Sequence, residues 1–246
     1  MPSNDVSVQL YTLRDHIAQD LPKTLEQLAS IGYTQVEPYN FVARADEYAL
    51  ALTANKLVAP TGHAPLLASD FDEVFTAAKK LGIATVIDPF IPADHWQDKE
   101  SIEATAAKLN DAARKASAYG IRVGYHNHDW EISSKIDGAT ALEYFSTLLA
   151  PEVVLEVDTY WVAVGGSDVL ALLESLGSRV IALHIKDGPI SKNHKEQVAV
   201  GNGDMPIDSI INSTAGLLHV VELDDFEGEI FDAVAQSHAY LAAGVN

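Results

Sequence analysis

The sequence contains no cysteine among its 246 residues. Disulfide bonds and thiolate metal sites are therefore excluded, and the absence favours a cytoplasmic protein over a secreted one. The N-terminal segment also lacks the basic start and the apolar run of a signal peptide. No apolar stretch approaches the roughly 20 residues that are needed to cross a bilayer, so no membrane partner is expected.

Basic residues are scarce, with 16 Lys and Arg against 35 Asp and Glu and a formal net charge of −19. A surface of this charge repels nucleic acid and anionic membranes, and no nucleic-acid partner is expected. It also disfavours a polyanionic substrate, although a local pocket can override the overall field. We expect the acidic excess to serve mainly solubility.

Linkers, low-complexity segments and sequence repeats are also absent, and short apolar runs alternate with longer amphipathic segments. Strands are predicted at 6–11, 35–39, 57–60, 84–88, 123–128, 153–158, 180–186 and 218–223. Helices are predicted at 21–31, 45–55, 71–81, 99–119, 140–149, 169–176, 207–214 and 229–241. Strict alternation of strands and helices predicts a parallel sheet.

The predicted units match an α/β fold of the (β/α)8 TIM barrel type, with residues 1–246 as a single domain. Such a barrel takes about 250 residues. No glycine-rich dinucleotide motif or P-loop follows the first strand, so a nucleotide-binding fold has no support. Local signals mark the helix ends: Asp70 is predicted to cap the helix at 71–81 and Gly82 to end it.

Polar side chains stand at the ends of all the predicted strands, where strands buried on both faces should be apolar. In chain order they are Gln9, Glu37, His63, Asp88, His126 with His128, Asp158, His184 with Lys186, and Glu222. In a barrel these ends gather at one mouth, where such enzymes place their chemistry. Burying ionisable groups without partners is costly, so the converging polar ends predict a functional site.

Asp158, His184 and Glu222 are predicted on three adjacent strands. Carboxylate oxygens and one imidazole suit a divalent ion such as Mn, Mg, Co, Fe or Zn. A site with few protein ligands leaves positions open for substrate oxygens. Each residue alone would be read as a hydrogen-bonded polar group that stabilises the barrel, but together they predict a metal site.

Segments along the whole chain resemble the sugar phosphate isomerase/epimerase family, the xylose isomerase-like TIM barrels that also include endonuclease IV. The matching segments are VQLYTLRD at 8–15, IGYTQVE at 31–37, YHNHDWEI at 125–132, LEVDTYWVAVGG at 155–166, LHIKDG at 183–188, VGNGD at 200–204 and VVELDD at 220–225. The family covers epimerases, isomerases, dehydratases and lyases, so the resemblance says little about the substrate.

The resemblance implies metal ligands at Asp158, His184 and Glu222, with manganese as the favoured ion. The fourth ligand is expected to be Glu131, which would reach back from the loop after the fifth strand. His126 is the alternative, because it stands where many family members have a glutamate at the end of that strand.

The resemblance also implies the chemistry. The metal would bind a ketone oxygen and a neighbouring hydroxyl of a sugar and stabilise an enediolate. Glu131 and Glu222 are the expected acid/base pair, and Lys186 would stabilise negative oxygen or donate a proton. Expected substrate contacts are Glu37, His63, His126 and His128, with Tyr160 and Trp161 either as an apolar wall for a sugar face or as rim packing.

These features predict a divalent-metal-dependent sugar isomerase or epimerase that acts on a small sugar or keto-sugar. The alternative is a lyase or dehydratase that carries out β-elimination on a keto-sugar or 3-keto-glycoside at the same metal site. A non-catalytic sugar-binding barrel is less favoured, because binding alone needs fewer ionisable groups. DNA repair would require a basic groove, and the family is compatible with a homo-oligomer.

Overall fold

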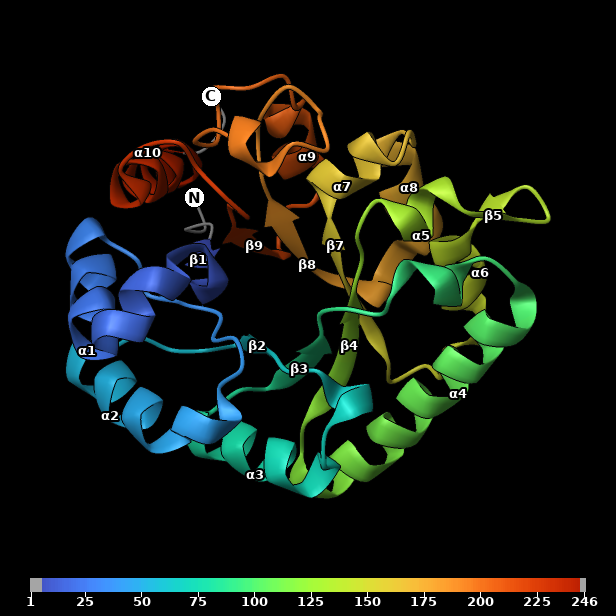
Figure 1. Cartoon of the computed structure of the whole chain (residues 1–246), viewed down its shortest axis with the longest axis horizontal. Coiled ribbons are helices and arrows are strands. Elements are labelled where there is room, and N and C mark those ends of the chain that lie inside the picture. Colours follow the sequence, from blue (N-terminus) through green and yellow to red (C-terminus); the bar gives the residue numbers. More distant parts are fainter. Residues whose placement is uncertain (1–5, 244–246) are drawn as a thin grey trace.

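A computed structural model describes residues 6–243, and its central sheet is curled into a barrel with helices around the outside (Figure 1). The strands are β1 (Val6–Val8), β2 (Thr61–His63), β3 (Thr85–Asp88), β4 (Arg122–His126), β7 (Val154–Asp158), β8 (Val180–Ile185) and β9 (Leu218–Val221). They are arranged in the order β1-β9-β8-β7-β4-β3-β2, and every neighbouring pair is parallel. The predicted single-domain α/β barrel is confirmed.

The segment 35–39 fills the place between β1 and β2, but it makes isolated bridges rather than a continuous strand. Gln9 pairs with Glu37, and Tyr39 pairs with His63, both in parallel. The amide of Glu37 donates to the carbonyl of Val8 at 2.8 Å. Pro38 in the middle of this segment has no amide hydrogen and cannot donate to a ladder. The strand predicted at 35–39 is therefore corrected to a bridged connection that closes the barrel.

The outer layer covers the sheet on all sides (Figure 1). Its main helices are α1 (Arg14–Ile31), α2 (Ala45–Asn55), α3 (Phe71–Leu81), α4 (Lys99–Ala116), α6 (Ala141–Leu148), α8 (Val169–Leu176), α9 (Ile207–Ser213) and α10 (Ile230–Ala243). The predicted ranges of α2, α3 and α8 are matched residue for residue. No helix in the described range 6–243 is long and apolar enough to cross a membrane.

Helix α3 shows why these predictions succeed. The Asp70 side chain accepts hydrogen bonds from the amides of Asp72 and Glu73, which the first turn of the helix leaves unpaired. Gly82 ends the helix with a φ of 74°, a left-handed conformation that glycine adopts without a steric penalty. The residues that flank the helix therefore determine where it starts and where it ends.

Helix α1 begins at Arg14, well before the predicted start at Leu21. Asp20 leaves the helical conformation with φ −157° and ψ 90°, and its side chain accepts from the amide of Lys23 at 3.0 Å. Asp20 therefore caps a second helical segment, in which Pro22 lies in the first turn and needs no amide hydrogen. The predicted helix corresponds to this second part of α1.

The strands also differ from prediction at their ends. The first strand stops at Val8, because Leu10–Leu13 forms a 3-10 helix whose first turn is capped by the side chain of Gln9. The strand predicted at 57–60 is displaced to Thr61–His63. Two short helices were not predicted, α5 (Trp130–Ser133) and α7 (Thr159–Val164), and they follow β4 and β7 at the mouth of the barrel. A small hairpin, β5 (Lys135–Ile136) with β6 (Ala139–Thr140), follows α5.

Candidate metal centre and cavity

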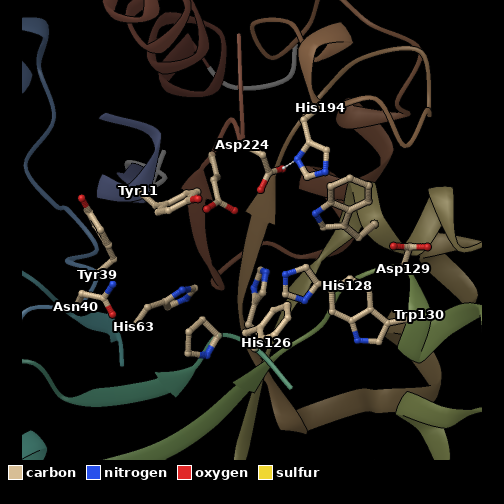
Figure 2. A pocket seen from close by; sticks show the side chains of 14 residues that line it. Tyr11, Tyr39, Asn40, His63, His126, His128, Asp129, Trp130, His194 and Asp224 are labelled. Atoms are coloured by element: carbon tan, nitrogen blue, oxygen red, sulfur yellow. Dashed lines mark ion pairs between the residues drawn. The ribbon is translucent and has the colours of Figure 1, made fainter. Parts of the chain in front are cut away.

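The carboxyl ends of the strands open into a cavity of about 400 Å³ (Figure 2). It is lined by Tyr11, Tyr39, Asn40, His63, Pro89, Phe90, His126, His128, Asp129, Trp130, Trp161, His194, Glu222 and Asp224. Aromatic rings and histidines dominate this lining, and its charged side chains are three carboxylates without any lysine or arginine. A concave, largely aromatic pocket with a few convergent polar groups is the usual form of a small-molecule site.

Four buried side chains converge at this cavity. Three of them belong to strands, and the fourth belongs to the residue that directly follows a strand. His126 ends β4, Asp158 ends β7, His184 lies near the end of β8, and Glu222 follows β9 directly. Each offers one nitrogen or oxygen, and these atoms all lie within 4.8 Å of one another. We call these four residues the upper group. Parallel pairing sets it up, because the carboxyl ends of the strands are in register, as for Asp158 opposite His184.

A second group lies beside the first and shares two histidines with it. It consists of His63, His126, Glu156 and His184, whose ligand atoms also lie within 4.8 Å of one another. We call it the lower group, because Glu156 lies two residues before Asp158 in β7 and does not line the cavity. Alternate residues of a strand share a face, so Glu156 and Asp158 both point into the barrel.

The two shared histidines direct different ring nitrogens at the two groups. His184 Nδ1 lies 2.6 Å from Glu222 Oε2, while its Nε2 lies 2.8 Å from Glu37 Oε1 and 3.1 Å from Glu156 Oε2. His126 Nε2 lies 3.8 Å from Asp158 Oδ2, while its Nδ1 lies 3.4 Å from Glu156 Oε2. Each imidazole therefore joins the two groups.

Lys186 supplies a buried positive charge next to the upper group. Its Nζ lies 2.9 Å from Asp158 Oδ2, 2.7 Å from Glu222 Oε2 and 2.7 Å from Asp224 Oδ2. Burial alone would lower the pKa of Lys186, but these three carboxylates raise it well above its usual range. The ammonium therefore stays charged and draws the carboxylates together.

The histidines and glutamates of the site titrate away from their ordinary values. Burial would raise the pKa of Glu222, but Lys186 and His184 hold it well below its usual range, so the carboxylate is ionised. The pKa of His126 is lowered well below normal by burial and by the positive charge of His184, so His126 is neutral. For His184, the neighbouring Glu156 and Glu222 overcome burial and raise the pKa.

The upper group fits a divalent metal ion. Two carboxylates and two imidazoles form a mixed oxygen and nitrogen donor set that suits borderline ions. Apart from its ion pairs with Lys186 and His126, Asp158 Oδ2 is a buried oxygen without a hydrogen-bond partner among the described residues, so it has lone pairs left to bind an ion. Neutral His126 has a ring nitrogen free to act as a ligand.

The structure brings most of the predicted site residues together. Asp158, His184 and Glu222 meet as predicted, and the fourth member of their group is His126, the alternative to Glu131. His63, His128 and Trp161 line the cavity, whereas Glu37 lies beneath it, paired with Gln9 at 2.7 Å and with His184.

Glu131 is not part of either group, because α5 turns its side chain away from the cavity. Its carboxylate accepts hydrogen bonds from the Tyr125 hydroxyl and from the amide of His128, the latter at 2.9 Å. Burial raises the pKa of Glu131 to about 8, so it is largely protonated at neutral pH. Tyr160, the other expected wall residue, is fully buried and contacts Ser191.

Sequence reasoning missed several residues of the site. Glu156 was overlooked because it lies inside an apolar strand, although its spacing of two from Asp158 is a signal that places both on one face. Asp224 follows Glu222 at the same spacing and contacts Lys186. His194, for which no role in the site was predicted, lies on the cavity wall 3.9 Å from Asp224 (Figure 2).

The glycine-containing segment 200–204 does not offer its amides to a ligand. The amides of Gly201 and Gly203 donate to Asp187 Oδ2 at 2.9 and 3.0 Å. Those of Gly188 and Met205 donate to Asp187 Oδ1 at 2.9 and 3.1 Å. A Cβ at Gly203 would lie only 2.3 Å from Asp187 Oδ1, so glycine is required there. The loop is organised around a protein carboxylate instead of a phosphate group.

Comparison with known proteins agrees with this architecture. The sequence model of the xylose isomerase-like TIM barrel family matches residues 25–213, more than half of the chain. No curated protein matches the chain in sequence.

Three solved structures illustrate the similarity of fold. A sugar phosphate isomerase/epimerase from Parabacteroides distasonis is 24% identical with a TM-score of 0.78, over 99% of this chain and 95% of its own. The probable 3-DHS dehydratase AsbF from Bacillus anthracis is 11% identical with a TM-score of 0.79, over 98% of this chain and 100% of its own. The IolI protein with a bound zinc atom is 16% identical with a TM-score of 0.70, over 97% of this chain and 95% of its own.

Proposed function

The chain belongs to the xylose isomerase-like TIM barrel family, and we propose that it is a divalent-metal-dependent isomerase or epimerase of an uncharged sugar that carries a carbonyl group. The observation that carries this proposal is the upper group, His126, Asp158, His184 and Glu222, whose ligand atoms converge beside a cavity large enough for a sugar.

We assign these four side chains as the metal ligands. A divalent ion bound by them would act as a Lewis acid on the sugar carbonyl and make the neighbouring C–H group more acidic. Two imidazoles beside two carboxylates favour manganese, iron, cobalt or zinc over magnesium. Manganese and zinc are the ions to test first, and the structural relative IolI binds zinc.

Glu222 is the proposed base that removes the proton beside the carbonyl. Its carboxylate lines the cavity and is ionised, because Lys186 and His184 offset the effect of burial on its pKa. Lys186 is held by three carboxylates and keeps its proton, so we assign it to neutralising developing negative charge rather than to proton transfer.

Two polar atoms of the cavity wall are proposed to orient the sugar. Trp161 Nε1 and His128 Nδ1 are buried and have no hydrogen-bond partner in the described part of the chain. Burial lowers the pKa of His128 to about 4, with a further contribution from Lys186, so its ring is neutral. Both residues line the cavity, where a sugar hydroxyl would satisfy these atoms.

The lining of the cavity supports an uncharged substrate. The nearest lysines are already paired, Lys186 with Glu222 and Asp224 and Lys192 with Asp129, and no lysine or arginine side chain lines the wall to bind a phosphate group. The amides of Gly201 and Gly203 are occupied by Asp187. Phosphate recognition normally uses arginine, lysine or free backbone amides, so we propose a sugar without phosphate.

Elimination at the same site is the second candidate function, and the position of the carboxylates is compatible with it. Glu222 and Asp224 lie two residues apart and both contact Lys186, so the ionisable groups gather on one wall. Glu131, expected as the second acid/base group of an epimerase, lies away from the cavity. A lyase needs a base and an acid for the leaving group, and it does not have to return the proton on the opposite face of the sugar.

Proton exchange in heavy water tests the function directly. The protein loaded with manganese or zinc would be incubated with neutral ketoses and 3-keto-glycosides, and products would be analysed by NMR and mass spectrometry. We expect deuterium at the carbon beside the ketone, together with an epimer or isomer.

The other outcomes are equally informative. Deuterium exchange with loss of a leaving group would replace the isomerase by the lyase. No exchange with any neutral carbonyl sugar, from protein shown to bind metal, would contradict both enzymatic assignments and favour a sugar-binding barrel.

A further inference from the structure

Glu156 is a fully buried carboxylate that contacts three histidines with one oxygen. Its Oε2 lies 2.6 Å from His63 Nε2, 3.1 Å from His184 Nε2 and 3.4 Å from His126 Nδ1. We propose that Glu156 is a positioning residue that orients both histidines of the upper group toward the metal. This inference rests on the proposed metal centre.

The strand pairing fixes this arrangement. His126 in β4 lies directly opposite Glu156 in β7, and Asp158, two residues on, lies opposite His184 in β8. The side chains of Glu156 and Asp158 therefore project from the same face of β7, one beneath the other, with the two histidines beside them. The barrel holds Glu156 below the metal centre with little freedom to move.

The chemical consequence follows from the two nitrogens of imidazole. A neutral imidazole carries a hydrogen on one nitrogen and a lone pair on the other. The hydrogens on His184 Nε2 and His126 Nδ1 would face Glu156 Oε2, at 3.1 and 3.4 Å, when a metal takes the lone pairs of His184 Nδ1 and His126 Nε2. These two nitrogens face Glu222 and Asp158. Carboxylates that fix a histidine ligand in this way commonly contribute 10- to 100-fold to metal affinity.

Glu37 takes a smaller part in the same layer. Its Oε1 accepts from Gln9 and lies 2.8 Å from His184 Nε2, but it makes no ion pair with His126. Glu37 therefore supports one histidine ligand, whereas Glu156 supports two. This difference provides a matched control within the chain.

The lower group could itself hold a metal, but not together with the upper group. Filling both would require His126 and His184 to bind metal through both ring nitrogens and lose both ring hydrogens. The upper group is favoured because Glu222 opens onto the cavity, whereas Glu156 and Glu37 lie beneath it. Glu156 is thus assigned to orienting ligands and not to binding the ion.

Metal affinity provides the first test. Wild type, Glu156→Gln, Glu37→Gln and Asp158→Asn would be stripped with chelator, checked for folding by circular dichroism, and titrated with cobalt(II) followed by visible absorption. We expect a 10- to 100-fold weaker Kd for Glu156→Gln, a smaller loss for Glu37→Gln and the largest loss for Asp158→Asn. Unchanged affinity in folded Glu156→Gln would overturn the proposal, as would abolished binding in Glu156→Gln with retained binding in Asp158→Asn.

Histidine tautomers of the metal-free protein provide a readout that does not need the metal. In protein labelled with 15N histidine, the resonance of His126, assigned with a His126→Gln variant, should report a hydrogen on Nδ1. In Glu156→Leu, which removes the acceptor, the hydrogen should move to Nε2, where the carboxylate of Asp158 can accept it. If wild type binds no cobalt but shows this tautomer change, the proposed metal function fails and the orienting role of Glu156 stands. An Nε2 hydrogen in wild type would overturn that role.

Discussion

The Tyr125 hydroxyl donates a hydrogen bond to the carboxylate of Glu131, which places Glu131 behind the wall of the cavity instead of inside it. Both side chains are buried, and the second oxygen of Glu131 accepts from the amide of His128. Glu131 therefore holds the turn after β4 in place, and the histidine at the end of that strand, His126, faces the other candidate ligands.

Replacing Glu131 by glutamine should leave metal binding intact and stabilise the protein at high pH. The folded pKa of Glu131, about 8, lies above that of the unfolded chain. The folded state therefore binds the extra proton, and its stability falls as pH rises from the unfolded value toward 8. Glutamine mimics the protonated form. We expect equal Tm values near pH 5 and a Tm several degrees higher for Glu131→Gln near pH 9.

Calorimetry at both pH values and a cobalt(II) titration would check this prediction. If folded Glu131→Gln lost metal binding, Glu131 would have to be a metal ligand after all. Glu174→Gln on the exposed face of α8 is a suitable control, because it removes one negative charge outside the site.

Glu222→Gln should bind metal more weakly and lose turnover without unfolding. The substitution removes the proposed base and one charge from a ligand while it preserves the shape of the side chain. General-base catalysis contributes about 10²- to 10⁴-fold, so kcat should fall by at least that range. Steady-state kinetics and circular dichroism are the measurements, and turnover within a few-fold of wild type would remove Glu222 from the mechanism.

A phosphorylated sugar should be a poorer substrate than its neutral counterpart. The cavity presents Asp129, Glu222 and Asp224 without a lining lysine or arginine, and the whole chain carries a net charge of −19. We expect a KM at least about ten times higher for the phosphate ester, with the difference shrinking as salt screens the repulsion. A lower KM for the phosphate ester would contradict this prediction. It would show that a positively charged group outside the cavity lining binds the phosphate.

Asp187→Asn should loosen the loop at 188–205. The carboxylate accepts four backbone hydrogen bonds, whereas an asparagine offers one acceptor oxygen and turns an amino group toward the other two donors. Hydrogen bonds to charged groups contribute about 1.5–3 kcal/mol, so Tm should fall by about 5 °C. Limited proteolysis should cut the variant within this loop, and a resistant loop with an unchanged Tm would contradict the assignment.

The helices were predictable because their signals are local. Asp70 and Gly82 bound α3 through contacts within a few residues, and such signals do not depend on the rest of the fold. The strand ends Asp158, His184 and Glu222 were predictable as a group, because a parallel barrel brings all its carboxyl ends to one mouth.

The remaining features depend on contacts that span the sequence. The direction of the Glu131 side chain is set by Tyr125 and by the turn of α5, neither of which the spacing of Glu131 reveals. Glu156 was not predicted as a site residue because its strand, with Val154 and Val157, has the apolar sequence of a core strand. Its histidine partners come from three other strands, which the sequence alone does not place beside it. Its importance became visible only with the register of β4, β7 and β8.

The bridged segment at 35–39 interrupts the continuous ladders of the barrel at one place along its circumference. Continuous ladders join the other strands, whereas Glu37 and Tyr39 attach to their neighbours through isolated bridges. Segments with few ladder hydrogen bonds exchange their amide hydrogens first through local opening. Glu37 also lies 2.8 Å from His184 Nε2. Each opening of this bridged segment would withdraw a carboxylate from a histidine of the candidate metal centre, and would couple fluctuations of the barrel wall to the orientation of that ring.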